Sequence, residues 1–146
     1  MLDIVSPYAA QFEAGLFVET DFQDAVARCS GRIVFLAVPF VWENAVQGSR
    51  AEWLKQCQDV RLSLGNYGLS VVQPHITAEC ICADDTSIPF ADDGYKQATL
   101  QAINHSNVVL VPDVIGWRKS RGVSAALKVA AKHNKPVYFV GVCTDV

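Results

Sequence analysis

The sequence lacks any apolar run close to the ~20 residues that a membrane-spanning helix needs, so no membrane protein is expected. It also lacks an excess of basic residues, because 12 Lys and Arg stand against 15 Asp and Glu, with a formal net charge of −3. That balance disfavours a nucleic-acid partner. Acidic residues such as Asp3 and Glu13 near the start do not suit a secretory signal peptide. We therefore expect a cytoplasmic protein.

Cysteines are few and odd in number, five in 146 residues, which argues against a disulfide framework. Cys80 and Cys82 form a C-x-C pair close to His75, and this spacing raises the hypothesis of a metal site. The acidic residues that could complete such a site are Glu79, Asp84 and Asp85. Structural zinc sites usually show a second ligand pair, and none is visible. We expect neither a metal nor a cofactor.

Three catalytic signatures are also missing. The chain has no Walker loop and no G-x-G-x-x-G after its first strong strand, and no Ser-His-Asp set can be placed in it. These absences exclude P-loop enzymes, dinucleotide-dependent enzymes of the usual type and serine hydrolases.

What the sequence does contain is an alternation of apolar runs and helical patterns. The runs "RIVFLAVPF", "LSVVQP", "NVVLVPD" and "PVYFVGVC" predict strands, the first at about residues 32–38. Between them the pattern predicts three helices: one from Ser49 to a stop at Gly65 or Gly68, one over residues 94–106 and one over residues 120–133. The order indicates an α/β fold, a doubly wound (Rossmann-like) parallel sheet of four or five strands flanked by helices.

We assign residues 32–146 to this domain and residues 1–31 to an N-terminal extension. Residues 22–29 of the extension favour a short helix before Gly31. The pattern does not show whether the extension packs on the sheet edge, covers a pocket or binds a partner.

Ligands of such sheets bind beyond the carboxyl ends of the strands. After the third strand, Ser120 can cap a helix whose first turn favours an anion, and Gly122 allows close backbone approach. The alternative is that Ser120 serves only as a cap. Trp117 is expected to pack this loop or to line the pocket.

Other candidate binding residues follow the first and second strands. Pro39 leads to Phe40 and Trp42, whose rings could stack on a planar ligand or simply pack. Arg50 stands at a helix start, where the macrodipole disfavours a cation, so either a ligand or an ion pair holds it. His75 is a possible acid, base or sugar contact, or a hydrogen-bonded structural histidine.

The segments "FLAVPF", "GLSVVQPH" and "VVLVPDVIGWRKSRGVSAALKVAAKHNKPV" resemble the nucleoside 2-deoxyribosyltransferase-like superfamily over about residues 32–142. The resemblance implies action on the N-glycosidic bond of a nucleoside or nucleotide, and assembly as a homo-oligomer. It also implies that the nucleophilic glutamate belongs at Ala126 and an aspartate at Thr99. This chain has neither carboxylate there.

A methyl group cannot stabilise or trap the oxocarbenium-like carbon of glycosidic cleavage. We therefore expect the family reaction to be absent or impaired, unless Glu79, Asp92 or Asp93 substitutes. Position 126 was either changed deliberately from glutamate or lost its carboxylate naturally. Whether the chain is an enzyme stays open, and the alternative is a non-catalytic nucleotide-binding or partner-binding regulatory protein. A weaker third possibility is a structural subunit that completes a partner's site.

Overall fold

A computed structural model of the chain describes residues 6–38, 50–72, 100–114 and 117–141. Five strands form one sheet in which every pairing is parallel. The strands are β1 (Phe17–Thr20), β2 (Ile33–Leu36), β3 (Ser70–Val72), β4 (Val108–Pro112) and β5 (Val137–Val140). Their order across the sheet is β1-β5-β4-β2-β3. The predicted doubly wound α/β class is confirmed.

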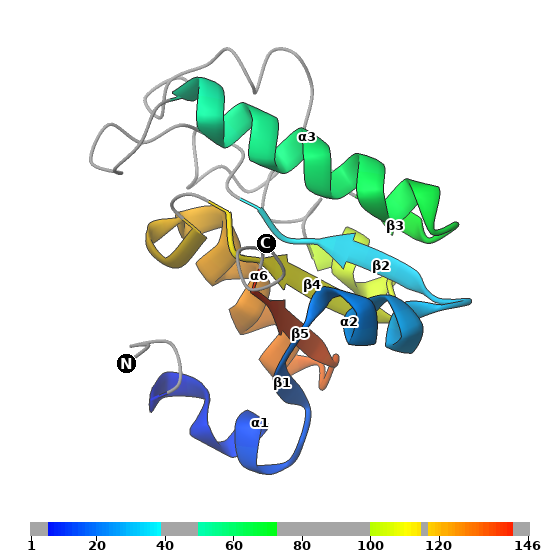
Figure 1. Cartoon of the computed structure of the whole chain (residues 1–146). Helices are drawn as coiled ribbons and strands as arrows, with labels where there is room; N and C mark the ends of the chain where they lie inside the picture. The colour runs from blue at the N-terminus through cyan, green and yellow to red at the C-terminus, as the bar shows by residue number, and fades with distance from the viewer. Residues whose placement is uncertain (1–5, 39–49, 73–99, 115–116, 142–146) are drawn as a thin grey trace.

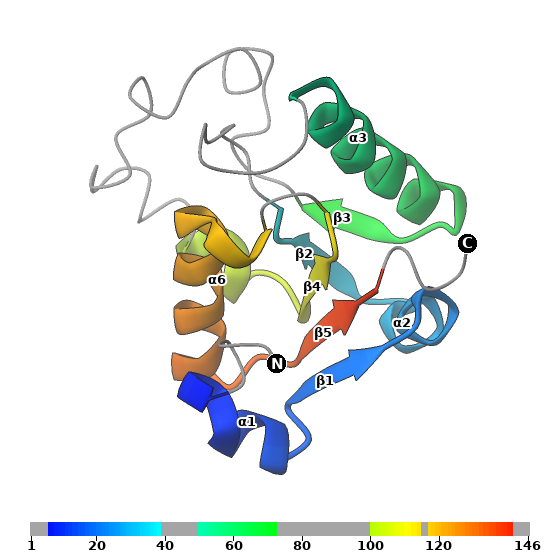
Figure 2. The same ribbon diagram turned by 60° about the vertical axis from the view of Figure 1, so that its left-hand side comes forward.

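Helices lie on both faces of this sheet (Figure 1). They are α1 (Ala9–Glu13), α2 (Phe22–Cys29), α3 (Arg50–Asn66) and α6 (Arg121–Lys132), with short 3-10 turns η1 (Ser6–Tyr8) and η2 (Trp117–Lys119). Residues 100–104 are also helical. Figure 2 shows α1 and α6 on one side of the sheet and α2 and α3 on the other. None of the described helices is long and apolar enough to cross a membrane.

Alternate side chains of β5 reach the two helical layers. The Phe139 ring stacks on Phe12 of α1 at 5.6 Å between centroids and contacts Trp117 of η2 at 5.8 Å. Its neighbour Tyr138 faces the opposite layer, where the guanidinium of Arg28 in α2 lies 5.7 Å from the ring centroid. This period-2 alternation is what a strand covered on both faces requires.

The core centres on β4, whose five residues are all buried. The strand pairs with β2 on one side and β5 on the other, so its backbone groups are satisfied within the sheet. Its continuous apolar sequence predicted a strand of this kind, and the structure confirms the prediction.

The fifth strand comes from the segment that the sequence analysis set apart as an extension. β1 pairs in parallel with β5 at the sheet edge, from Phe17 beside Val137 to Thr20 beside Val140. The run "GLFVET" carries the signal, an apolar stretch that begins after Gly15, which adopts φ 75°. A strand of four residues is too short to show a clear periodic pattern. The helix expected at residues 22–29 is confirmed as α2.

The two long helices also match their patterns. α6 begins after Ser120 and is followed by His133, close to the predicted 120–133. α3 ends at Asn66, and Gly68, with φ 76°, terminates the turn behind it. The apolar residues of α3 recur at steps of three and four, and those whose side chains are described are buried: Trp53, Cys57, Val60 and Leu64.

The central strand yields a stability prediction. Leu110 is fully buried, so Leu110→Ala should remove contacts, leave a cavity and lower the free energy of unfolding by about 2–5 kcal/mol. Leu62 on α3 is 65% exposed, and Leu62→Ala should change that free energy by less than about 0.5 kcal/mol. Urea unfolding followed by circular dichroism compares the two. Equal losses would show that β4 is not the centre of the core.

Candidate binding site at the carboxyl edge of the sheet

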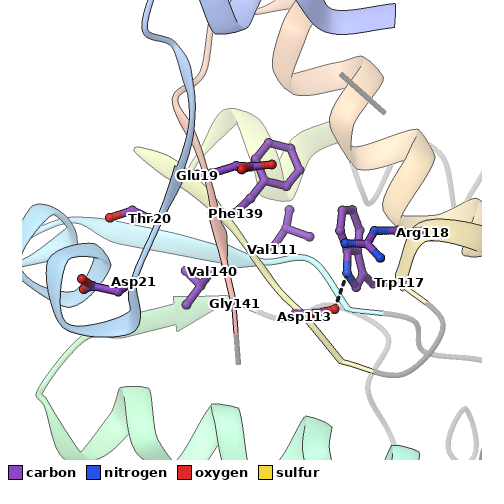
Figure 3. A pocket seen from close by; sticks show the side chains of 10 residues that line it. All are labelled: Glu19, Thr20, Asp21, Val111, Asp113, Trp117, Arg118, Phe139, Val140 and Gly141. Carbon is purple, nitrogen blue, oxygen red and sulfur yellow. Dashed lines mark hydrogen bonds between the residues drawn. The ribbon is translucent and has the colours of Figure 1, made fainter. Parts of the chain in front are cut away.

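A cavity of about 440 Å³ opens at the carboxyl ends of β1, β4 and β5 (Figure 3). Its volume falls in the ~300–1,000 Å³ range typical of small-molecule pockets. The lining residues come from three places: the end of β1 (Glu19, Thr20, Asp21), the end of β4 and the turn after it (Val111, Asp113, Trp117, Arg118), and the end of β5 (Phe139, Val140, Gly141). The position agrees with the general rule for ligands of parallel sheets.

The floor of the cavity follows from the register of the sheet. Phe139 of β5 is paired with Val111 of β4 on one side and with Glu19 of β1 on the other. Paired residues of neighbouring strands project to the same face, so the three side chains form one row. The floor is therefore apolar over β4 and β5 and ends in a carboxylate at the sheet edge.

The turn after β4 supplies the opposite wall. The indole Nε1 of Trp117 donates a hydrogen bond of 2.8 Å to Oδ1 of Asp113, four residues earlier. The Arg118 guanidinium lies 5.1 Å from the Trp117 ring centroid, within the range of a cation–π contact. Figure 3 shows Trp117 and Arg118 across Val111 from Glu19 and Phe139. Trp117 is only 5% exposed, so its ring is held by packing, whereas the Arg118 side chain is exposed.

The end of β1 is fastened to α2. The hydroxyl of Thr20 donates a hydrogen bond to the Asp24 carboxylate, which also accepts a 2.7 Å bond from Nε of Arg28. The hydrogen bond from Thr20, which is the largest single cause, and the hydrogen bond and charge of Arg28 hold the pKa of Asp24 below its ordinary value of 3.8. Asp21 caps the helix by accepting from the Asp24 backbone N–H at 2.7 Å. These contacts fix where the chain leaves β1.

Acidic groups dominate the electrostatics of the cavity. Among its described lining residues, Glu19, Asp21 and Asp113 are acidic and Arg118 is basic, so their formal net charge is −2. Asp113 is half-buried, which keeps its carboxylate at the edge of a partly dehydrated space. Such a lining favours neutral or cationic groups over anions.

Five predicted site residues lie in the described part of the chain, and burial is described for four of them, Trp117, Ser120, Gly122 and Ala126. Trp117 lines the cavity. Ser120 is 6% exposed, and its Oγ accepts a 3.2 Å hydrogen bond from the Val123 N–H, so its role as a helix cap is present. Gly122 is buried in the first turn of α6. A ligand contact by Ser120 or Gly122 stays a prediction.

Ala126 is 1% exposed and belongs to the hydrophobic core. With Val123, Leu127 and Ala130 it forms the buried stripe of α6, at helical steps of three and four residues. It does not line the described cavity. Its correspondence to the nucleophile position stays a prediction drawn from the resemblance.

The remaining predicted site residues fall outside the described residues. They are Pro39, Phe40, Trp42, His75 and Thr99. Arg50 begins α3, but its side chain is not described. The C-x-C pair also lies outside, and within the described ranges no three His, Cys, Asp or Glu residues gather to hold a metal ion.

The two described cysteines are buried within the core. Burial raises the pKa of the Cys57 thiol to about 12 and that of the Cys29 thiol to a smaller degree. A nucleophilic cysteine needs a lowered pKa, so neither thiol has the properties of one.

Sequence reasoning missed Glu19 and Asp113 as cavity residues. Asp113 is the last residue of the run "NVVLVPD" that predicted the third strand, and the rule that ligands bind at the carboxyl ends of strands could have identified it. Glu19 had no such signal, because its strand was not recognised and its pairing partner is more than a hundred residues away.

The family model of a domain of unknown function, DUF1937, matches residues 32–142. No curated protein and no solved structure matches the chain. The matched range includes β2 to β5 and α6, whereas Glu19, Thr20 and Asp21 precede it.

The contact between Thr20 and Asp24 can be tested by titration. Because the pKa of Asp24 is lower in the folded state, Asp24 stabilises the fold at pH values above its unfolded-state pKa. This stabilisation is lost as the pH falls through the folded-state pKa. Thr20→Val keeps the side-chain shape and should raise the Asp24 pKa towards 3.8, and Arg28→Gln should raise it as well. Carboxyl-carbon NMR measures both. An Asp24 pKa unmoved by Thr20→Val would refute the assignment.

Proposed function

We propose a small-molecule-binding function for this chain, which belongs to the DUF1937 family of domains of unknown function. The ligand is a nucleoside or nucleotide, and the domain binds it without cleaving its glycosidic bond. It is thus a non-catalytic relative of the deoxyribosyltransferases and nucleotide N-glycosidases that the sequence resembles.

The observation that carries the binding proposal is the cavity at the carboxyl edge of β1, β4 and β5. It combines an apolar floor with a few polar groups at its rim, the usual composition of a small-molecule site. Trp117, chosen from the sequence as a pocket residue, forms one wall.

The lining suits the parts of a nucleoside. Phe139 and Trp117 line the cavity and offer a small aromatic surface for a base, since they are 6% and 5% exposed. The carboxylates of Glu19 and Asp113 are acceptors for sugar hydroxyl groups. The choice of this ligand class also rests on the resemblance of the segment from Gly116 to Val137.

The non-catalytic part of the proposal rests on Ala126. A covalent mechanism needs a carboxylate in contact with the anomeric carbon. The methyl of Ala126 is buried in the α6 stripe and cannot supply one. Assembly as a homo-oligomer, also implied by the resemblance, stays a prediction.

Thermal unfolding with nucleosides and their 5′-monophosphates tests binding. A ligand present at about 100 times its dissociation constant should stabilise the fold by ~2.7 kcal/mol. Asp113→Asn should weaken that binding, whereas Asp59→Asn, an equal change on the exposed face of α3, should not. No shift with any of these compounds, or equal effects of the two variants, would contradict the proposal.

Position 126 can be tested with a matched pair of variants. Because Ala126 is buried, Ala126→Glu and Ala126→Gln should both destabilise the fold by ~1–3 kcal/mol through overpacking. The loss of unfolding free energy caused by Ala126→Glu should grow as pH rises from 5 to 8, since burial disfavours the charged form of glutamate. The loss caused by Ala126→Gln should stay constant. Urea unfolding at both pH values measures this difference.

Neither variant should release base from a nucleoside or a nucleotide. In the opposite result, the destabilisation by Ala126→Glu would not depend on pH. That variant would also release base, while Ala126→Gln would release none. Such a result would place the position in an open catalytic site and overturn the non-catalytic proposal.

A further inference from the structure

We propose that the segment ahead of the family match makes the cavity selective for phosphate-free ligands, and that Glu19 is the residue that sets this selectivity. The preferred ligand presents hydroxyl or amino donors to the acidic rim and carbon surface to the floor. The inference rests on the proposed function, because it assumes that this cavity binds the ligand.

Charge provides the first argument. Three carboxylates and one guanidinium line a space of about 440 Å³. The guanidinium of Arg118 already lies over the Trp117 ring, and its side chain is exposed. A phosphate monoester, with nearly two negative charges at neutral pH, would meet more repulsion than attraction in a partly dehydrated site.

Hydrogen-bonding capacity provides the second argument. An ionised carboxylate only accepts hydrogen bonds. Oδ1 of Asp113 is engaged by Trp117, and within the described ranges neither its Oδ2 nor the Glu19 carboxylate receives a side-chain hydrogen bond. Groups of a ligand that face these oxygens must therefore donate, as hydroxyl and amino groups do and phosphate oxygens do not.

Of the two acidic groups at the β1 end, Glu19 is the one with no side-chain hydrogen bond to either oxygen within the described ranges. Asp21 is engaged as the cap of α2, and Thr20 donates to Asp24. Glu19 instead projects into the row formed with Phe139 and Val111, so it sits over the floor of the cavity. It lies thirteen residues ahead of the matched range, which starts at residue 32.

Calorimetric titration with the four ribonucleosides, their 5′-monophosphates and 1,4-diaminobutane tests the inference. Each nucleoside that binds should do so about tenfold more tightly than its monophosphate. Glu19→Gln should lower affinity for the nucleoside and raise affinity for the monophosphate. The ratio of the two affinities should therefore become smaller for each nucleoside and its monophosphate. Glu13→Gln, the same change on an exposed α1 residue outside the cavity, should behave as the unaltered chain does.

The proposed selectivity would be overturned if monophosphates bound as tightly as nucleosides. It would also be overturned if Glu19→Gln and Glu13→Gln changed the affinities equally. Binding of the diamine alone, lost in Glu19→Gln, would uphold a donor-selective, phosphate-free site and reject the nucleoside proposal. Absence of binding by every probe would reject both. Glu19 is exposed, so the variant should keep its unfolding temperature, and this check separates loss of binding from loss of fold.

Discussion

The position of β4 at the centre of an all-parallel sheet is the constraint on which the rest of the structure depends. Both edges of this strand are paired and all five of its residues are buried, so its register with β2 and β5 is fixed by burial on two faces. A slip of one residue would exchange the faces of every side chain. The same register carries through β5 to β1 and places Val111, Phe139 and Glu19 in one row. The cavity floor is thus a consequence of strand pairing.

The polar groups of the cavity come from residues at the ends of the strands and in the turns that immediately follow them. Beyond β4, a hydrogen bond between Asp113 and Trp117 sets the wall. Beyond β1, the contacts of Thr20 and Asp21 with α2 set the opposite rim. The family match covers the first of these features and not the second. A short segment at the sheet edge, ahead of the family match, therefore supplies part of the polar lining.

Much of the fold could be predicted from sequence because burial on both faces leaves continuous apolar runs, as in "NVVLVPD", and because α6 carries both a Ser120 cap and a regular apolar stripe. β1 could not, because four residues at a sheet edge leave almost no periodic signal. The site was predicted only in part. Trp117 was found through its place after a strand, but Glu19 reaches the cavity through pairing with a residue distant in the chain, which no local pattern encodes. Ala126, which the resemblance places at the nucleophile position, is a buried core residue, and its correspondence to that position stays a prediction.

The central claim is that a small ligand binds at the carboxyl edge of β1, β4 and β5. The most direct measurement is an NMR titration that follows the Trp117 indole N–H, which lies in the cavity wall and donates to Asp113. The claim predicts that a bound nucleoside shifts this resonance together with the backbone amides of residues 19–21, 113 and 139–141. Shifts confined to residues away from this edge, with the indole resonance unchanged at saturation, would contradict it.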